Sequence, residues 1–133
     1  MKRVFADAYY FFALLNKNEP KHSAARDFAD LFRGQLVTTR WILTELADGM
    51  AKPKWRSAFI ALYDELIATP HVHVIPFSDE LFATGIELYR GREDKDWSLT
   101  DCISFVVMRR ENITDALTAD HHFEQAGFVA VLK

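Results

Sequence analysis

Short apolar runs alternate with longer stretches of helical periodicity along this chain of 133 residues, and this alternation constrains the fold more than any other feature. A strand, a helix and a further strand in this order form a right-handed unit in which the strands are parallel and the helices cover the sheet. The length suits one domain with a sizeable core. The sequence therefore predicts an α/β fold with a single domain over residues 1–133. The expected architecture is a three-layer α/β/α sandwich around a mostly parallel five-stranded sheet.

The expected elements follow from the apolar runs, the helix caps and the helix breakers. Strands are expected over residues 4–6, 36–38, 72–75, 116–118 and 128–132. Helices are expected over residues 8–16, 21–32, 40–50, 55–68, 78–90 and 98–111. In such folds functional groups gather at the carboxyl ends of the strands, so the residues that follow the strands are the first candidates for a site.

Composition and charge exclude several classes of protein. Half of the residues are apolar and 26% are charged, which is typical of a globular domain rather than a disordered chain. The net charge of −3 gives no overall positive field for nucleic acid, although local patches matter more than the total. No stretch approaches the roughly 20 apolar residues that span a bilayer, and Asp7 interrupts an N-terminal run that resembles a signal peptide. Since Cys102 is the single cysteine, no internal disulfide can form, and a cytoplasmic location is expected.

Two aspartates follow predicted strands. Asp7 comes after the strand at residues 4–6, and Asp120 comes after the strand at residues 116–118. Aspartate is a common helix N-cap, and capping is the simpler explanation for either residue taken alone. Both positions nevertheless lie at the edge of the sheet where ligands bind in such folds.

Two further acids lie on predicted helices. Asp101 forms a capping-box pattern with Ser98, but it also lies on a helix that is apolar nearly all round, so capping and function both remain open. Glu45 falls between Trp41 and Ile42 on a helical wheel, inside an apolar arc, and it has no basic partner one turn away. A charge that faces a core without a partner is costly, which favours a functional role for Glu45.

The four acids together suggest one site, because all of them could converge at the same edge of the sheet. Converging carboxylates repel one another, and a hard divalent cation removes this repulsion. Oxygen ligands of this kind suit Mg²⁺ or Mn²⁺. With a phosphate ester as substrate, such a site polarises the phosphoryl oxygens and activates water.

The neighbouring histidines and the basic residues have simpler explanations. His121 and His122 are adjacent, so on a helix they point about 100° apart and do not easily share one metal; they are expected to be surface or supporting residues. Phe123 is expected to anchor the turn that holds Asp120. Positive charge clusters in Lys52, Lys54 and Arg56 and again in Arg90, Arg92 and Lys95. Each cluster is either a solvated face or a guide for phosphate groups.

The order of four sequence blocks resembles the PIN domain family over essentially the whole chain. The blocks are "VFADAYYFFALL", "TELADGM", "SLTDCISFVVMRR" and "ALTADHHFEQAGF". The last two blocks, in which Asp101 and Asp120 are 19 positions apart, are the most specific part. The length is similar to that of the single-domain VapC-type toxins of prokaryotic toxin–antitoxin pairs.

This resemblance implies a magnesium-dependent ribonuclease whose acidic quartet is Asp7, Glu45, Asp101 and Asp120. It also implies a homodimer and a small antitoxin that covers the site. One position departs from the family pattern, since Ala8 stands where a serine or threonine usually follows the first acid. A catalytically weak or silent PIN domain that binds RNA or a protein is therefore the alternative. A phospho-accepting receiver module, the third class considered, is disfavoured because Pro76 and Phe77 stand at the strand end where the acceptor aspartate would be.

Overall fold

The fold is built on a five-stranded sheet in which every neighbouring pair of strands is parallel, in the order β3-β2-β1-β4-β5. The structure, a computed structural model, describes residues 2–133. The strands are β1 (Arg3–Ala6), β2 (Gln35–Thr39), β3 (Val72–Ile75), β4 (Asp115–Leu117) and β5 (Val129–Ala130). The predicted α/β fold with a mostly parallel five-stranded sheet is confirmed, and the sheet is in fact all parallel.

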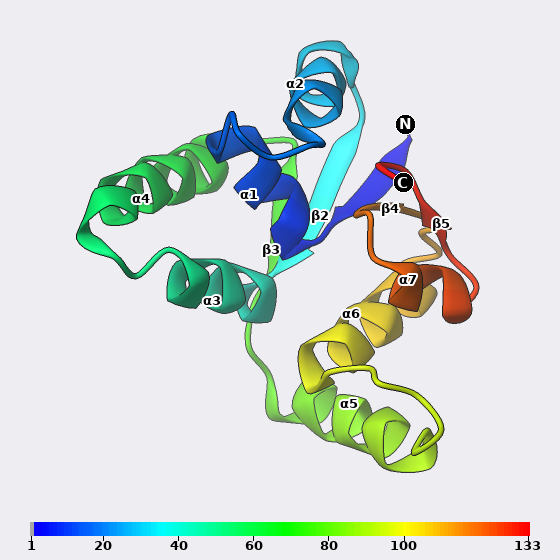
Figure 1. The fold of residues 1–133 in the computed structure, drawn as a ribbon. Coiled ribbons are helices and arrows are strands. Elements are labelled where there is room, and N and C mark those ends of the chain that lie inside the picture. Colours follow the sequence, from blue (N-terminus) through cyan, green and yellow to red (C-terminus); the bar gives the residue numbers. More distant parts are fainter. Residues whose placement is uncertain (1) are drawn as a thin grey trace.

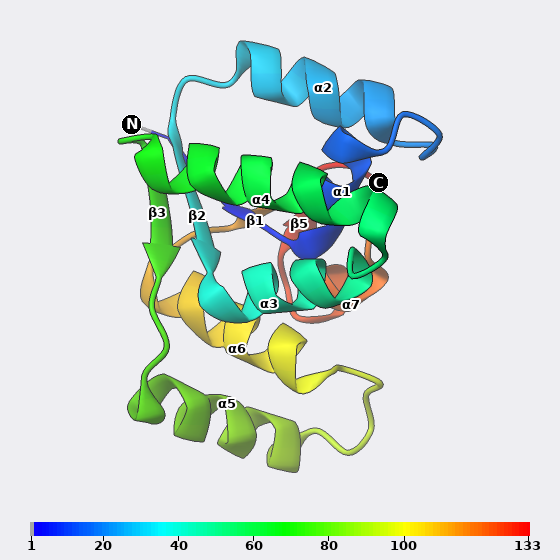
Figure 2. The ribbon, with the colours of Figure 1, turned by 90° about the vertical axis from the view of Figure 1, so that its left-hand side faces the viewer.

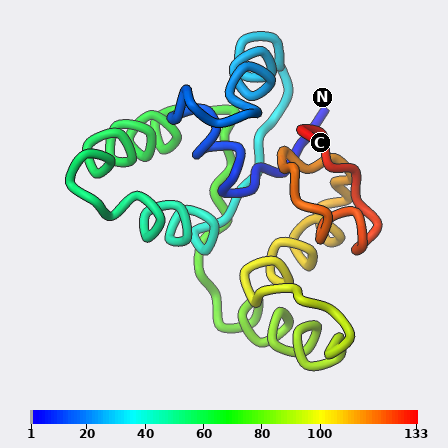
Figure 3. Tube along the Cα trace, viewed as in Figure 1, coloured from blue at the N-terminus to red at the C-terminus, as the bar shows by residue number. Residues whose placement is uncertain are grey.

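Helices cover both faces of this sheet. They are α1 (Ala8–Leu15), α2 (His22–Leu31), α3 (Arg40–Gly49), α4 (Pro53–Ala68), α5 (Asp79–Gly91), α6 (Leu99–Arg110) and α7 (His121–Gln125). Figure 1 shows α1, α2 and α4 on one side of the sheet and α5 and α6 on the other, and Figure 2 shows the same layers from a second direction. The trace in Figure 3 shows that the chain leaves β3 at one edge, runs through α5 and α6, and returns beside β1 as β4.

Local chemistry explains most of the helix boundaries. The side chain of Thr39 caps α3 by accepting a hydrogen bond from the backbone N–H of Ile42 at 3.1 Å, and Ser78 caps α5 in the same way. Pro53 begins α4 rather than preceding it by two residues, because the first turn of a helix does not need the N–H that proline lacks. The short helix α7 was not predicted, and β5 is shorter than predicted.

The core covers both faces of the sheet, with buried residues from α1 and α3 as well as from α6, and the part under α6 fixes the loop that carries Asp120. Residues 102–108 of α6 are all buried, as expected for a central helix. Phe123 is fully buried and packs edge-to-face on Phe105, with ring centroids 4.9 Å apart, so its predicted role as an anchor is confirmed. This packing holds α7, and with it Asp120, against α6. No helix within residues 2–133 combines the length and apolarity needed to cross a membrane.

Candidate active site

Asp7 is a buried carboxylate at the end of the central strand. It occupies the N-cap position of α1 but makes no side-chain capping bond, so the simple capping role does not hold for this residue. Only 7% of it is exposed, and its Oδ2 accepts a hydrogen bond of 2.8 Å from Thr118 Oγ1. Burial is the main reason why the pKa of Asp7 rises to about 7, and the charges of Asp101 and Glu45 raise it further against the opposing effect of Thr118.

The parallel register of β1 and β4 explains why Asp7 meets Thr118. Ala6 pairs with Leu117, so the residues that follow them, Asp7 and Thr118, leave the sheet side by side. Thr118 is fully buried, and its Oγ1 also accepts a hydrogen bond of 3.1 Å from the backbone N–H of Asp120. The hydroxyl group of Thr118 therefore connects Asp7 with the turn that carries Asp120.

Asp101 and Asp120 both act as caps and also face one another across a histidine. Asp101 completes a capping box with Ser98, and Asp120 caps α7 through the backbone N–H of His122 at 2.9 Å. The Nδ1 atom of His122 lies 3.1 Å from Asp101 Oδ2 and 3.4 Å from Asp120 Oδ2. Burial is the main reason why the pKa of Asp101 rises, and the negative charge of Asp120 adds to this rise. Capping and proximity to the other acids are therefore compatible in these two residues.

Glu45 lies at the open rim of this group. The expectation that it faces the core is wrong, because its side chain is exposed while its neighbours Ile42 and Leu46 are buried. Partial desolvation raises the pKa of Glu45, and the charges of Asp101 and Asp120 raise it further. Glu45 therefore belongs to the acidic group through partial desolvation and through the charges of the other acids, although its side chain is not enclosed in the core.

The four predicted acids form one electrostatic group. The negative charges of Asp101 and Glu45 raise the pKa of Asp7, and the negative charge of Asp120 raises the pKa of both Glu45 and Asp101. The donors are carboxylate oxygens, and the basic side chains beside them among the ion pairs of residues 2–133 are His121 and His122. Among residues 2–133, no three of these carboxylates come within 4.8 Å of one another, so a hard divalent cation, which would offset their repulsion, would have to draw them closer together.

Because the carboxyl group of Asp7 keeps its proton longer in the folded chain, the metal-free protein should lose stability as the pH rises. The unfolded chain releases this proton near pH 4 and the folded chain near pH 7, so the free energy of unfolding falls across this interval. Between pH 5 and pH 8 the loss should be about 2–3 kcal/mol. Urea unfolding in EDTA should show it in the parent but not in Asp7→Asn. The exposed Asp48→Asn serves as the control, and equal slopes in the parent and Asp7→Asn would contradict the assignment.

Thr118 should position Asp7, because its hydroxyl satisfies both Asp7 Oδ2 and the backbone N–H of Asp120. Thr118→Val should lower the free energy of unfolding by about 1–3 kcal/mol and raise the pKa of Asp7 further. Thr38→Val is the matched control, since the hydroxyl of buried Thr38 donates to the backbone carbonyl of Ala6 at 2.9 Å rather than to a carboxylate. An NMR titration of the carboxyl groups distinguishes the two. The same Asp7 pKa in both variants would show that Thr118 does not position the acid.

Thr118 was missed by the sequence reasoning because it reads as part of an apolar strand. Its only signal is its polar character two residues before Asp120. The structure agrees with the predicted position of the histidines at the surface or beside the acids, since His121 is exposed and His122 contacts Asp101, but one ligand atom each of Asp120, His121 and His122 lies within 4.8 Å of the other two, closer than expected. Their ring centroids are 4.5 Å apart, with an angle of 53° between the ring planes.

The two basic clusters differ in how many of their side chains form ion pairs with acids of the same chain. Arg92 makes two hydrogen bonds of 3.0 Å to Asp94, and Arg90 and Lys95 also lie near acids. Lys52, Lys54 and Arg56 are exposed and form no ion pair within residues 2–133, although Arg56 donates to the backbone carbonyl of Ala51. Lys52 is the N-cap of α4, and Lys54 and Arg56 lie in its first turn, so the cluster is at the start of α4, which Figure 1 shows at the end of α3 that is remote from β1.

Comparison with known proteins agrees with this fold. The chain is 26% identical over 128 residues to the 23S rRNA-specific endonuclease VapC20 of Mycobacterium tuberculosis, which covers 96% of this chain and 97% of the relative. The crystal structure of that VapC20, described as a sarcin-ricin loop cleaving toxin, matches with a TM-score of 0.86 at 25% identity, covering 95% of this chain and 96% of the other.

Two more distant structures share the fold at 17% identity. VapBC2 from Rickettsia felis, bound to a DNA fragment from its promoter, matches with a TM-score of 0.66 over 96% of each chain. FitAcB from Neisseria gonorrhoeae matches with a TM-score of 0.67 over 96% of this chain and 94% of the other. The model of the PIN domain matches residues 4–129. Because this match spans nearly the whole sequence, the chain belongs to the PIN domain family.

Proposed function

We propose that this protein is an Mg²⁺-dependent endoribonuclease of the VapC type, the toxin of a toxin–antitoxin pair. The observation that carries the proposal is the buried Asp7 carboxylate, whose pKa rises to about 7 beside Glu45 and Asp101. A protein gains nothing in stability from such an arrangement of acids unless a cation or a substrate uses it. The 26% identity to an rRNA endonuclease along the whole chain supports the same activity.

The residues present fit a hard cation. Asp7 and Asp101 would hold Mg²⁺, with Mn²⁺ as a substitute, and Glu45 and Asp120 would complete the set of oxygen donors. When bound, the cation would stabilise negative charge on the phosphoryl oxygens of the RNA. Thr118 keeps Asp7 in place, and His122 keeps Asp101 and Asp120 at a fixed separation. Glu45, at the exposed rim, or Asp120 would orient the attacking water.

The absence of a hydroxyl at Ala8 favours the alternative of a silent PIN domain, but Thr118 supplies a hydroxyl to Asp7 from the neighbouring strand. This contact supports the active enzyme over a domain that only binds RNA or a protein. The test is incubation of ribosomal RNA with purified protein in Mg²⁺ and in EDTA. The RNA should be cleaved in the buffer with Mg²⁺ and not in the buffer with EDTA. Equal cleavage in both buffers, by protein free of contaminating nuclease, would refute the proposal.

RNA should be guided to the site by Lys52, Lys54 and Arg56, which are exposed and form no ion pair with the acids of residues 2–133. Replacing all three with alanine should weaken binding and lower the salt slope of log K by about 2, since each phosphate contact contributes about 0.7 for single strands. Binding is measured at several salt concentrations with Asp7→Asn as the parent, which prevents cleavage. The triple alanine variant of Arg90, Arg92 and Lys95 carries the same charge change. A larger loss of RNA binding in this second variant would show that the residues that guide RNA lie at the end of α5 and in the segment between α5 and α6.

We also propose a homodimer and a small antitoxin as partners. Several large apolar side chains are exposed, including Phe77 at 56%, Phe82 at 44% and Ile60 at 54%. An apolar surface of this kind is typical of proteins that associate. Light scattering at micromolar concentration should report twice the mass of the chain, and a monomer would contradict the dimer. A small reading frame beside the gene would support the antitoxin.

A further inference from the structure

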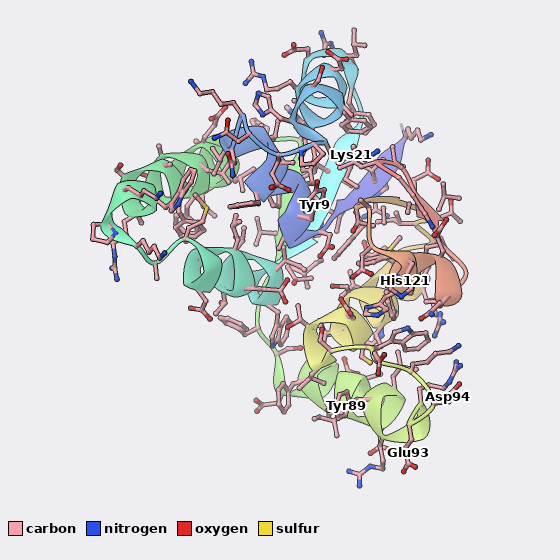
Figure 4. All side chains as sticks on the ribbon, viewed as in Figure 1. Tyr9, Lys21, Tyr89, Glu93, Asp94 and His121 are labelled. Atoms are coloured by element: carbon pink, nitrogen blue, oxygen red, sulfur yellow. The ribbon has the colours of Figure 1, made fainter. Side chains whose placement is uncertain are left out.

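A second possible cation site lies beside the acidic group and has a different donor set. The carboxylate of Asp120 is shared by two imidazoles: His121 Nδ1 lies 3.6 Å from one of its oxygens, and His122 Nδ1 lies 3.4 Å from the other. One ligand atom from each of the three residues lies within 4.8 Å of the other two. In Figure 4 the labelled His121 extends from α7 on the side of that helix that faces α6.

The spacing suits a small tetrahedral metal. Zinc binds imidazole nitrogen and carboxylate oxygen at about 2.0–2.2 Å, which places neighbouring ligand atoms about 3.4 Å apart in a tetrahedron. The two nitrogen–oxygen separations, each to a different oxygen of Asp120, are close to this value before any metal binds. The His121 side chain is 64% exposed, so it is free to make the small rotation that brings its nitrogen to the third corner.

The donor chemistry differs from that of the four acids. Imidazole nitrogen prefers Zn²⁺ and similar transition metals, whereas Mg²⁺ prefers oxygen donors alone. One carboxylate and two neutral imidazoles carry a single negative charge, which a divalent cation more than neutralises. We propose that Asp120, His121 and His122 bind Zn²⁺, and that bound Zn²⁺ closes the neighbouring Mg²⁺ site.

Bound Zn²⁺ would close the Mg²⁺ site because the two sites share ligands. This inhibition, unlike zinc binding itself, rests on the proposed function. Asp120 belongs to both sets, so its engagement by Zn²⁺ removes one oxygen donor from the acidic group. His122 also lies 3.1 Å from Asp101 Oδ2, so a rotation of its ring toward Zn²⁺ withdraws the partner of Asp101. Zn²⁺ should therefore act as an inhibitor at concentrations far below those of Mg²⁺.

Binding is tested by competition between the metal-free full chain and a colorimetric zinc chelator, and this needs no nuclease activity. The parent should take up one equivalent of Zn²⁺. His121→Ala should weaken binding by more than about 100-fold, since even outer partners of metal ligands cost 10–100-fold. His73→Ala, an exposed histidine of β3, is the matched control and should bind like the parent. Asp7→Asn should also bind like the parent, because Asp7 is not part of the zinc set.

A second readout tests the coupling between the two cations. Excess Mg²⁺ should raise the melting temperature of the parent, one equivalent of Zn²⁺ should abolish that rise, and His121→Ala should keep it. Equal Zn²⁺ affinity in the parent, His121→Ala and His73→Ala would overturn the site, and His122 would then serve only as a hydrogen-bond partner of Asp101. Zinc binding through His121 in a chain that cleaves no RNA would leave the zinc site standing and refute the proposed nuclease instead.

Discussion

Asp7→Asn should lose RNA cleavage by a factor of at least about 10²–10³ while the chain remains folded. The substitution keeps an oxygen that can accept the hydrogen bond from Thr118 Oγ1, so the packing at the end of β1 is preserved. It removes the buried negative charge that would attract the cation and, through it, stabilise charge on the scissile phosphate. Cleavage is measured as the initial rate on one RNA in excess Mg²⁺.

Asp48→Asn is the control for this loss, because Asp48 is an exposed acid of α3, the same helix as Glu45. It removes one negative charge without touching the acidic group, and it should cleave like the parent. Circular dichroism and melting in EDTA confirm that both variants are folded. Full cleavage by Asp7→Asn would remove Asp7 from the proposed site, and loss of cleavage in Asp48→Asn would indicate an effect of charge alone.

Much of the fold follows from local patterns in the sequence. The alternation of apolar runs with helical stretches predicted the parallel sheet, since β1, β2 and β4 are mostly buried and helices such as α5 and α6 begin at the predicted caps Ser78 and Ser98. The three aspartates could be placed at one edge because they follow strands or begin a helix. These features are determined by residues that are close in sequence.

The remaining features depend on contacts between distant segments. Thr118 reaches Asp7 only because β4 pairs with β1 in one particular register, which no local pattern specifies. The exposure of Glu45 depends on where along α3 the contact with the core ends. A helical wheel gives only the direction of a side chain around the helix axis, so it does not show this end. The cluster of Asp120, His121 and His122 depends on side-chain torsions at the start of a five-residue helix that is too short to show a period.

Asp101→Asn should separate the capping role of Asp101 from its proposed role in the metal site. If Asp101 only caps α6, the asparagine oxygen replaces it and any change in stability is the same with and without metal. In the acidic group, the loss of one charge relieves repulsion, because Asp101 lies near Asp120 and raises the pKa of Asp7 and Glu45. The metal-free variant should then be more stable than the parent by about 1 kcal/mol.

The response to Mg²⁺ should change in the opposite direction. A cation that binds only the folded chain stabilises it, by about 2.7 kcal/mol at a hundred times the dissociation constant. The parent should show this gain, whereas Asp101→Asn should gain much less, because it has lost one of the two carboxylates that would hold the cation. Its nuclease activity should fall together with the response to Mg²⁺.

Thermal melting of the parent and of Asp101→Asn, each in EDTA and in excess Mg²⁺, tests the acidic metal site most directly. The account predicts that the variant melts above the parent in EDTA, that Mg²⁺ raises the melting temperature of the parent, and that it raises that of the variant much less. If Mg²⁺ leaves the parent unchanged and the substitution lowers the melting temperature equally in both buffers, then Asp101 is a helix cap and the four acids do not form a metal site.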